Sequence, residues 1–455
     1  MLFRSQPYPI ECLDHSAPAG SSLAVAGMGL VCYDVLTALT IGRGGTFKDR
    51  CDRTDRLRYV PSGREPTITL YSRSGVPHCA KSAAGVDPYG QYEPVVCTRD
   101  AFAALTNPGG SLVRRHVDFQ TQLLPLIVAE MQARYYLQAA LLAGGETEST
   151  AVRTVLRQGW VDGRYEKVVD GLQPRYGRFD PATHLFAGSN RRYRSAAEYQ
   201  GHVYDMIEAD LTEALRPGGS PVKAAEEVLR ILRDQLRSVI EFGGLSLDSY
   251  IEFQSHIRGR INRVDAGPPL MRSQQLLGLL DAGVVRMPLG PNPELAAGPD
   301  GVRLTSTAVD EPTIVTVDAV VRGHLDLPSL ARSDSPLLSR LYAKGRLTQL
   351  SYGDTPVGSV AINEEFHPYD TEGRLQPNIS LLGVLTEGVR YFTHYLPSPR
   401  SRLRAVYDAQ NCVEAVIGGS RLLDVDDTPD FEAVMDPDRH QAVYEAQDCV
   451  EAVIG

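Results

Sequence analysis

The stretch from Leu23 to Asp34, LAVAGMGLVCYD, is the feature that most constrains the fold of this chain. A short apolar run ends at Gly27, Gly29 follows two residues later, and an apolar pattern at helical spacing begins at Leu30. A buried strand, a tight glycine turn and a helix in this order bring main-chain N–H groups toward a pyrophosphate. The stretch therefore predicts a dinucleotide-binding turn, with Gly27, Gly29 and Leu30 as cofactor contacts.

A glycine pair of this kind also occurs in ordinary strand-to-helix turns, and that interpretation stays open. The third small position of the motif is Cys32 instead of glycine. A second, nicotinamide-type dinucleotide domain often tolerates a residue other than glycine at this position.

The next predicted strand, Thr67–Tyr71, indicates which dinucleotide the turn would bind. A fold that prefers NAD has a carboxylate near the end of this strand for the ribose hydroxyl, whereas one that prefers NADP has a cation for the 2′-phosphate. Here Ser72, Arg73 and Ser74 follow the strand, and this combination favours NADPH. The alternative is that Arg73 belongs to a solvated turn and binds nothing.

Charge, hydropathy and cysteine spacing argue against several classes of protein. The formal net charge of −10 over 455 residues argues against a nucleic-acid partner, which needs a basic surface. No apolar run reaches the roughly 18 residues of a membrane span, and the N-terminus lacks the apolar segment of a signal peptide. The seven cysteines include no C-x-x-C pair and H-E-x-x-H is absent, so no metal site is expected. We expect a cytoplasmic protein that acts on a small molecule.

A chain of this length holds more than one domain. Its pattern predicts an α/β protein, in which a Rossmann-like nucleotide-binding domain carries a large, mostly helical insertion and is completed by strands that return late in the chain. The expected parts are a lead-in at 1–22, a nucleotide-binding part at 23–112, a helical domain at 113–290, return strands at 291–418 and an acidic tail at 419–455 with a duplicated last helix.

Apolar side chains at helical spacing mark the longest predicted helices. One stripe runs from Leu123 to Tyr135, and another runs from Val228 to Ile240 in a helix that begins at Ser220 and Pro221. Short apolar and β-branched runs predict the later strands, at 302–306, 314–317, 318–323, 357–362 and 381–383. The last predicted helix, 408–417, lies in a segment that recurs near the C-terminus at 444–455.

Several short motifs follow one another between residues 8 and 417. They are Ala24–Leu30 with Asp34, Leu39–Gly45, Tyr59–Pro66, Tyr71–Pro77, Leu124–Leu126 with Glu130 and Met131, and Leu382–Gly388 with Thr393. In this order they resemble the bacterial, often actinobacterial, two-dinucleotide FAD/NAD(P)-binding proteins, which are related to the class B flavoprotein monooxygenases and the amine N-hydroxylases.

The resemblance implies that FAD is bound by one Rossmann half, NADPH by a second, and that a helical region lies over the substrate. It also implies a partial second sheet of the FAD type, with the turn from Gly383 to Gly388 beside the flavin and with Thr386 and Glu387 as further cofactor contacts. Glu387 and Arg390 are candidates to orient flavin or substrate, and no residue is assigned as a catalytic acid or base.

The function implied is that of an FAD- and NADPH-dependent oxidoreductase, a flavin monooxygenase that N-oxygenates a small amine or amino acid in specialised metabolism. The chain departs from the family because no G-x-G-x-x-G for the FAD pyrophosphate precedes Leu23. A separate chain that supplies the FAD half, a non-catalytic NADP-binding fragment and a helical protein-interaction module therefore stay open. Bound flavin with NADPH oxidation would mark the enzyme, and stabilisation by NADP(H) alone would mark the binding module.

Overall fold

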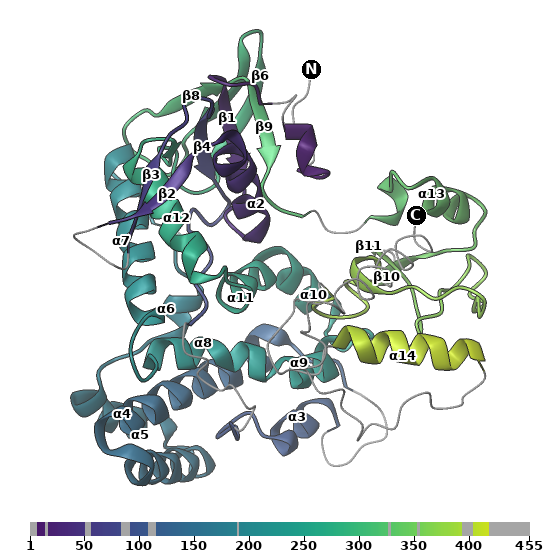
Figure 1. Ribbon diagram of the computed structural model, residues 1–455. Coiled ribbons are helices and arrows are strands. Elements are labelled where there is room, and N and C mark those ends of the chain that lie inside the picture. The colour runs from purple at the N-terminus through teal and green to yellow at the C-terminus, as the bar shows by residue number, and fades with distance from the viewer. Residues whose placement is uncertain are drawn as a thin grey trace, which may run out of the picture. The chain divides into compact units, whose positions relative to one another are not determined.

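The computed structural model describes residues 7–13, 17–50, 56–82, 92–107, 115–188, 191–325, 329–352, 355–393 and 404–417 (Figure 1). The chain divides into two compact units, Met1–Asp326 and Leu327–Gly455. The predicted acidic tail and the second copy of the repeated segment lie outside the described residues.

A parallel sheet of four strands lies in the first unit. Its strands follow the order β5-β4-β1-β9, and each neighbouring pair runs parallel. The structure confirms the three strands that short apolar runs predict, whereas β5 is too short to leave such a pattern. The bounds are β1 Ser22–Ala26, β4 Thr67–Tyr71, β5 Val285–Arg286 and β9 Ala319–Arg322.

The two faces of this sheet are covered by different layers. Successive side chains of a strand point to opposite faces, so Leu23 and Val25 of β1 face one layer and Ala24 faces the other. Leu23 and Val25 pack in one buried cluster with residues of α2 (Leu30–Leu39) and α12 (Leu270–Asp281). The predicted helix after the glycine turn is thus confirmed, and it lies beside the parallel sheet (Figure 1). Its buried apolar side chains pack in the cluster that covers this face of the sheet.

An antiparallel sheet of three strands covers the second face. Its strands place Val302, Leu304 and Val317 in a buried cluster with Ala24 and Val320 of the parallel sheet. Each of the large aliphatic side chains stabilises the fold by about 1.5–3 kcal/mol through burial. The chain then passes into β9, so a strand that returns late in the chain does complete the parallel sheet. The bounds are β6 Glu294–Gly298, β7 Gly301–Thr305 and β8 Ile314–Val317.

Helices dominate the chain between α2 and β5. The predicted start at Ser220 is confirmed, because its hydroxyl accepts the main-chain N–H of Lys223 while Pro221 opens α8. The prediction of a single helix through Ile240 is wrong, because Leu232 leaves helical geometry (φ −80°, ψ 3°) and separates α8 from α9. Both helices bury their apolar side chains, so the pattern alone does not reveal the break. Among the described residues, no helix combines the length and the apolar character needed to cross a lipid bilayer.

The remaining elements of the first unit are the following. They are η1 Ile10–Cys12, η2 Ile41–Arg43, the hairpin β2 Thr46–Asp49 and β3 Leu57–Val60, α3 Arg99–Thr106, η4 Phe119–Leu123, α4 Leu124–Val161, α5 Tyr165–Tyr176, α6 Pro181–Leu185, α7 Ala196–Ala214, α8 Pro221–Ile231, α9 Arg233–Ile240, α10 Leu247–Glu252, η5 Phe253–Ile257 and α11 Arg258–Asp265.

The second unit contains a hairpin and two described α-helices. The predicted strand at 381–383 is wrong, because Leu381 and Leu382 pair with no strand among the described residues and Gly383, with φ +75°, already begins the 3-10 helix η7. The last predicted helix is confirmed as α14, which begins earlier than expected, at Arg404. The bounds are η6 Leu330–Arg332, α13 Pro336–Ala343, β10 Gln349–Tyr352, β11 Thr355–Val360, η7 Gly383–Thr386 and α14 Arg404–Ile417.

A buried carboxylate joins the segment before α3 to α4. Glu130 of α4 is fully buried and accepts hydrogen bonds from the main-chain N–H groups of Val95, Val96 and Cys97 at 2.6–2.9 Å. The hydroxyl of Tyr92 donates to the same carboxylate. Glu130, which belongs to one of the motifs that carry the family resemblance, therefore has a structural role.

Replacing Glu130 with glutamine is expected to lower the free energy of unfolding by about 2 kcal/mol. The amide keeps one acceptor oxygen, but its NH₂ group faces main-chain donors that then lose their partner. Urea unfolding measures the change, and Glu146→Gln, at an exposed glutamate just after the break of α4 at Gly144 and Gly145, should change stability by less than about 0.5 kcal/mol. Equal small changes in the two variants would contradict this role.

Candidate functional site

The bend between β1 and α2 admits no side chain at Gly27. Its N–H donates to the carbonyl of Tyr71 at 2.8 Å, and its φ of +133° is one that residues with a side chain rarely adopt. A Cβ at this position would lie 2.4 Å from the carbonyl oxygen of Gly323, the residue that follows β9. The bend and the end of β9 therefore approach each other at main-chain distance.

Gly323 also explains why the third motif position can be Cys32. In a G-x-G-x-x-G turn the third glycine permits close packing of helix on strand. Here a Cβ on Gly323 would lie 2.8 Å from Cγ1 of Val25 and 3.3 Å from Cβ of Cys32. The glycine that allows the close approach thus comes from the end of β9 and not from α2. Sequence reasoning recognises Gly323 only as the end of a strand, because its role depends on the pairing of β9 with β1.

The first turn of α2 leaves main-chain donors unused. The helix begins at Leu30, and Gly29 precedes it in extended geometry without a side-chain cap. Within the described part of the chain, the N–H groups of Gly29, Leu30 and Val31 form no hydrogen bond. Free N–H groups at a helix N-terminus carry partial positive charge and favour an anion.

His78 packs against Gly29 at the same turn, and the sequence does not single it out. A Cβ on Gly29 would lie 3.1 Å from Cε1 and Nε2 of the His78 ring. Nδ1 donates to the carbonyl of Ala266 at 2.9 Å, which leaves Nε2 as an acceptor in the neutral ring. Burial lowers the pKa of His78 to about 4, helped by Arg263 and opposed by the bond to Ala266. The ring is therefore neutral at pH 7.

Protonation of His78 is expected to destabilise the fold in acid. Its pKa is about 4 in the folded protein and about 6.5 in an unfolded chain, so the unfolded state binds the proton first as the pH falls. The free energy of unfolding should drop by up to about 3 kcal/mol between these two values and level off below them. Urea unfolding across this range measures the drop, and His78→Asn should lack it. If the free energy of unfolding of the wild type and of His78→Asn changed equally with pH, the expectation would be contradicted.

The sheet brings the two predicted parts of the coenzyme site to one edge. β1 and β4 pair in parallel register, with Ala26 opposite Tyr71. Gly27 and Ser72 therefore follow at the ends of neighbouring strands, where the carboxyl ends of parallel strands form ligand sites. Gly27, Gly29, Leu30 and the turn 72–74 all lie at this edge.

Ser72 and Ser74 stabilise this turn through their hydroxyl groups, whereas the guanidinium of Arg73 takes no part in these bonds. The hydroxyl of Ser72 accepts the N–H of Gly75 at 3.0 Å and lies 3.4 Å from the hydroxyl of Ser74. Arg73 is exposed, and it forms no hydrogen bond or ion pair with any residue that the structure describes. A cation without a protein partner at this edge is suited to an external anion.

The predicted flavin contacts lie in the second unit and are bonded among themselves. Thr386 is fully buried, and its hydroxyl donates to the carbonyl of Gly383 at 2.8 Å. The buried carboxylate of Glu387 accepts the N–H and the hydroxyl of Thr393 at 2.8 and 2.7 Å. These side chains therefore shape the turn, and their contact with a flavin stays a prediction.

Gly388 and Arg390 close the same turn. The N–H of Gly388 donates to the carbonyl of Arg390 at 2.8 Å, and the φ of Gly388 is +119°. The guanidinium of Arg390 lies 4.7 Å from the ring centre of Phe366 and 3.3 Å from the carboxylate of Asp408. Both candidates for orienting flavin or substrate, Glu387 and Arg390, are thus engaged in contacts within the second unit.

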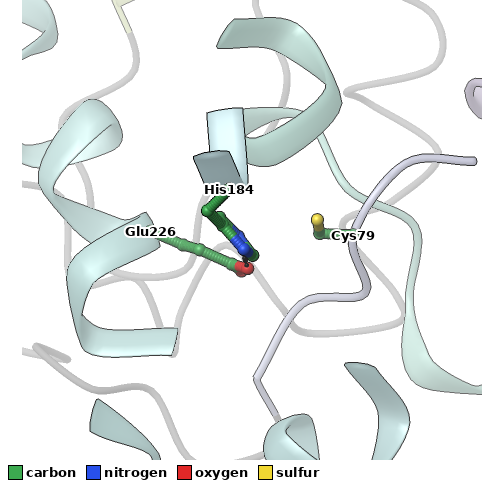
Figure 2. Close-up of side chains that lie close together, drawn as sticks. All are labelled: Cys79, His184 and Glu226. Atoms are coloured by element: carbon green, nitrogen blue, oxygen red, sulfur yellow. Dashed lines mark hydrogen bonds and ion pairs between the residues drawn. The ribbon is translucent and has the colours of Figure 1, made fainter. Parts of the chain in front are cut away.

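A cavity of about 260 Å³ lies beside the bend and is lined by residues of α2, α7, α11 and α12. At its edge Cys79, His184 and Glu226 converge from three segments of the chain, with their donor atoms within 4.8 Å of one another (Figure 2). Figure 2 shows the ring of His184 directed at the carboxylate of Glu226, to which Nε2 donates at 2.7 Å.

Two cations of the protein already neutralise this cluster. The ammonium of Lys223 lies 2.9 Å from the carboxylate of Glu226 and 2.5 Å from that of Asp210. Arg263 donates to Sγ of Cys79 at 3.0 Å, and burial raises the pKa of this thiol above its usual range. Cysteine, histidine and glutamate are zinc ligands, but a metal ion here would have to compete with both cations. The cluster therefore has the character of a buried ion-pair network.

The sequence of this chain is similar to those of known amino-acid N-monooxygenases over most of its length. No family model matches the chain. The chain is 28% identical over 420 residues to an L-aspartate N-monooxygenase (nitrosuccinate-forming) of Streptomyces davaonensis, across 90% of this chain and 63% of that enzyme. It is 28% identical over 399 residues to the nitrosuccinic acid synthase npaA of Aspergillus oryzae, across 83% of this chain and 58% of that enzyme.

A third relative has a similar identity to this chain and a name of the same kind. The chain is 29% identical over 423 residues to an L-aspartate N-monooxygenase (nitrosuccinate-forming) of Streptomyces cremeus, across 87% of this chain and 60% of that enzyme. The chain spans about three fifths of the length of the curated relatives it matches. Over most of its own length, it is similar to enzymes that are named as monooxygenases acting on the nitrogen of an amino acid.

Proposed function

We propose that this chain contains the NADPH-binding part of an oxidoreductase that N-oxygenates a small amine or amino acid. The observation that carries the proposal is the edge of the parallel sheet, where the N–H groups of Gly29, Leu30 and Val31 have no hydrogen-bond partner among the described residues. They follow the glycine bend after β1, with the ring of His78 packed against Gly29. A Rossmann-like domain binds a pyrophosphate in this way, at the N-terminus of the helix that follows its first strand.

The residue type at the end of β4 favours NADPH over NADH. The 2′-phosphate that distinguishes the two coenzymes is an anion, and Arg73 is an exposed cation without a described protein partner. Ser72 and Ser74 hold the turn that presents it. Bound NADPH supplies hydride, and the chain's own groups hold its phosphates at the bend and at Arg73.

We propose FAD as the second cofactor, on chemical grounds. A monooxygenase needs a group that activates oxygen, and a flavin is the cofactor that accepts hydride from a nicotinamide and reacts with oxygen. The described side chains of the 383–388 turn do not by themselves fit a flavin, because Thr386 and Glu387 are committed to the turn. We therefore assign no flavin-dependent step to residues of this chain.

The relatives indicate the class of substrate. Their names specify N-oxygenation of L-aspartate, and we propose a small amino acid as the substrate here. In such a reaction one atom of O₂ goes to the amine nitrogen and the other leaves as water, while NADPH provides two electrons.

The coenzyme preference is expected to depend on Arg73. Calorimetric titration should show NADP⁺ binding at least tenfold more tightly than NAD⁺, and Arg73→Met should remove most of this difference. The loss of one charge-assisted contact to the phosphate costs about 1.5–3 kcal/mol, which is roughly a 10- to 150-fold change in Kd. Arg303→Met, at an exposed arginine of β7, is the matched control and should change neither affinity. Equal binding of the two coenzymes by the wild-type protein would contradict the NADPH assignment.

A turnover assay separates the enzyme from a binding module. The protein is incubated with NADPH, added FAD and L-aspartate, and both NADPH consumption and N-oxygenated product are measured. Product that depends on all three components supports the proposed activity. Binding of NADP⁺ without any turnover, with or without FAD, would instead favour a non-catalytic NADP-binding protein.

A further inference from the structure

The helical region packs against the turn that carries Arg73 and against the segment that follows it. A Cβ on Gly188, which follows α6, would lie 2.5 Å from the carbonyl oxygen of Ser74, so the main chain after α6 touches this turn directly. On the other side, the carbonyl of Arg263 on α11 accepts the N–H of Cys79 at 2.9 Å. The guanidinium of Arg263 also donates to the carbonyl of His184 at 2.6 Å. The segment after α6, α11 and the chain after β4 therefore form one packed assembly.

A second arginine, Arg260, belongs to this assembly and has no carboxylate partner among the described residues. Arg260 lies one turn before Arg263 on α11, and its guanidinium lies 5.3 Å from the ring centre of Phe186. Among the residues that the structure describes, Arg260 forms neither a hydrogen bond nor an ion pair. It is partly buried, so its guanidinium gives up some contact with water without gaining a carboxylate in return.

The charges that act on Arg260 are those of other arginines. Burial lowers the pKa of Arg260, and the guanidinium groups of Arg263 and Arg73 lower it further. Arg263 is engaged with Cys79 and His184, whereas Arg73 and Arg260 donate to no residue in the described part of the chain. Geometry places the two side chains in the same region, because Arg260 lies over Phe186, and Gly188, two residues later, touches Ser74 beside Arg73. Like charges in one region repel, and an anion bound between the two guanidinium groups would remove this repulsion.

A phosphomonoester has the charge and the geometry that such a pair requires. It carries about −1.5 to −2 charge at pH 7 and presents three acceptor oxygens. A guanidinium donates through a planar fork that matches phosphate oxygens, and stacking on an aromatic ring holds that fork in place. Phe186 provides such a ring for Arg260.

We propose that Arg260, stacked on Phe186, is the second guanidinium that binds the 2′-phosphate of NADPH, opposite Arg73. This inference rests on the proposed coenzyme site. It assigns to the helical region a part in coenzyme selection, because the 2′-phosphate would be held between the end of β4 and α11. A coenzyme without this phosphate gains nothing from Arg260.

The test compares ligands that differ by one phosphate. NADP⁺, NAD⁺, adenosine 2′,5′-bisphosphate and inorganic phosphate are titrated calorimetrically into the wild-type protein and into Arg260→Met, Arg260→Lys, Arg73→Met and Arg303→Met. Arg260→Met should weaken NADP⁺ and adenosine 2′,5′-bisphosphate at least tenfold and leave NAD⁺ unchanged, and Arg260→Lys should weaken them less. Arg303→Met should match the wild type. Retained NAD⁺ affinity also shows that each variant is folded.

The outcomes separate this inference from the proposed function. If Arg73→Met weakens NADP⁺ but Arg260→Met does not, the role of Arg260 is wrong and the NADPH site stands. If Arg260→Met weakens the binding of NADP⁺ and of NAD⁺ equally, the residue supports the fold and does not contact the 2′-phosphate. This result also overturns the inference. Tight binding of inorganic phosphate that NADP⁺ does not displace would assign the arginine pair to a free anion instead. If NADP⁺ does not bind the wild-type protein, both proposals fail together.

Discussion

Replacing Gly27 with alanine is expected to lower the free energy of unfolding by about 3–5 kcal/mol, through backbone strain together with overpacking. The strain arises because φ at this position is +133°, a conformation in which a side chain clashes with its own backbone. The overpacking arises because the new Cβ would lie 2.4 Å from the carbonyl oxygen of Gly323. This oxygen belongs to the main chain at the end of β9 and cannot move without breaking the β1–β9 pairing.

Gly20→Ala is the matched control for this experiment. Gly20 also has a positive φ, +75°, but nothing lies within 4 Å of the position of its Cβ. Only the backbone cost of about 1–2 kcal/mol should appear there. Urea unfolding of both variants without coenzyme measures the difference, and equal losses would show that the approach of β9 to the bend is not as close as the structure has it.

Lys223→Met is expected to cost about 3–5 kcal/mol, because it leaves buried carboxylates without their counter-charge. The ammonium of Lys223 is almost fully buried and bonds both Asp210 and Glu226, at 2.5 and 2.9 Å. Burial alone would lower the pKa of Lys223, but the two carboxylates outweigh it and raise the pKa, so the side chain is charged at pH 7. The loss should shrink in acid, where Asp210 and Glu226 can take up protons instead.

Two further variants show whether this loss is electrostatic. The triple variant Lys223→Met, Asp210→Asn, Glu226→Gln removes the charges together and should recover at least half of the lost stability, because breaking a buried pair costs more than replacing it. Arg216→Met breaks an exposed pair with Glu213 at 3.6 Å and should cost less than about 1 kcal/mol. A triple variant as unstable as Lys223→Met would indicate that lost packing, and not unpaired charge, is responsible.

The local parts of the fold could be predicted from sequence because neighbouring residues determine them. The apolar run before Gly27, the helical spacing after Leu30 and the β-branched run at Thr67–Tyr71 each specify an element within a few residues. The hydroxyl at Ser220 likewise marks the start of α8 through a local hydrogen bond. Patterns of this kind depend on backbone geometry and on which face of a helix or strand is buried. Consecutive residues determine both.

The site contains residues that no local pattern reveals. Gly323 becomes part of the bend only because β9 pairs with β1, nearly 300 residues apart in the chain. His78, whose Nδ1 donates to the carbonyl of Ala266, packs against Gly29. Arg260 joins the region of the 72–74 turn because it lies over Phe186, and Gly188, two residues later, touches Ser74. The break at Leu232 is hidden for the opposite reason, because the same apolar stripe suits one helix or two.

The central claim is that NADPH binds with its pyrophosphate on the free N–H groups at the start of α2, and amide hydrogen exchange tests it most directly. Exchange over the first seconds is measured by mass spectrometry on peptides that cover Gly27–Leu36, with and without saturating NADP⁺. We expect the N–H groups of Leu30 and Val31 to exchange rapidly in the free protein and to be protected by NADP⁺, while α5 is unaffected at these times. Saturating NADP⁺ that leaves exchange at Gly29, Leu30 and Val31 unchanged would contradict the claim.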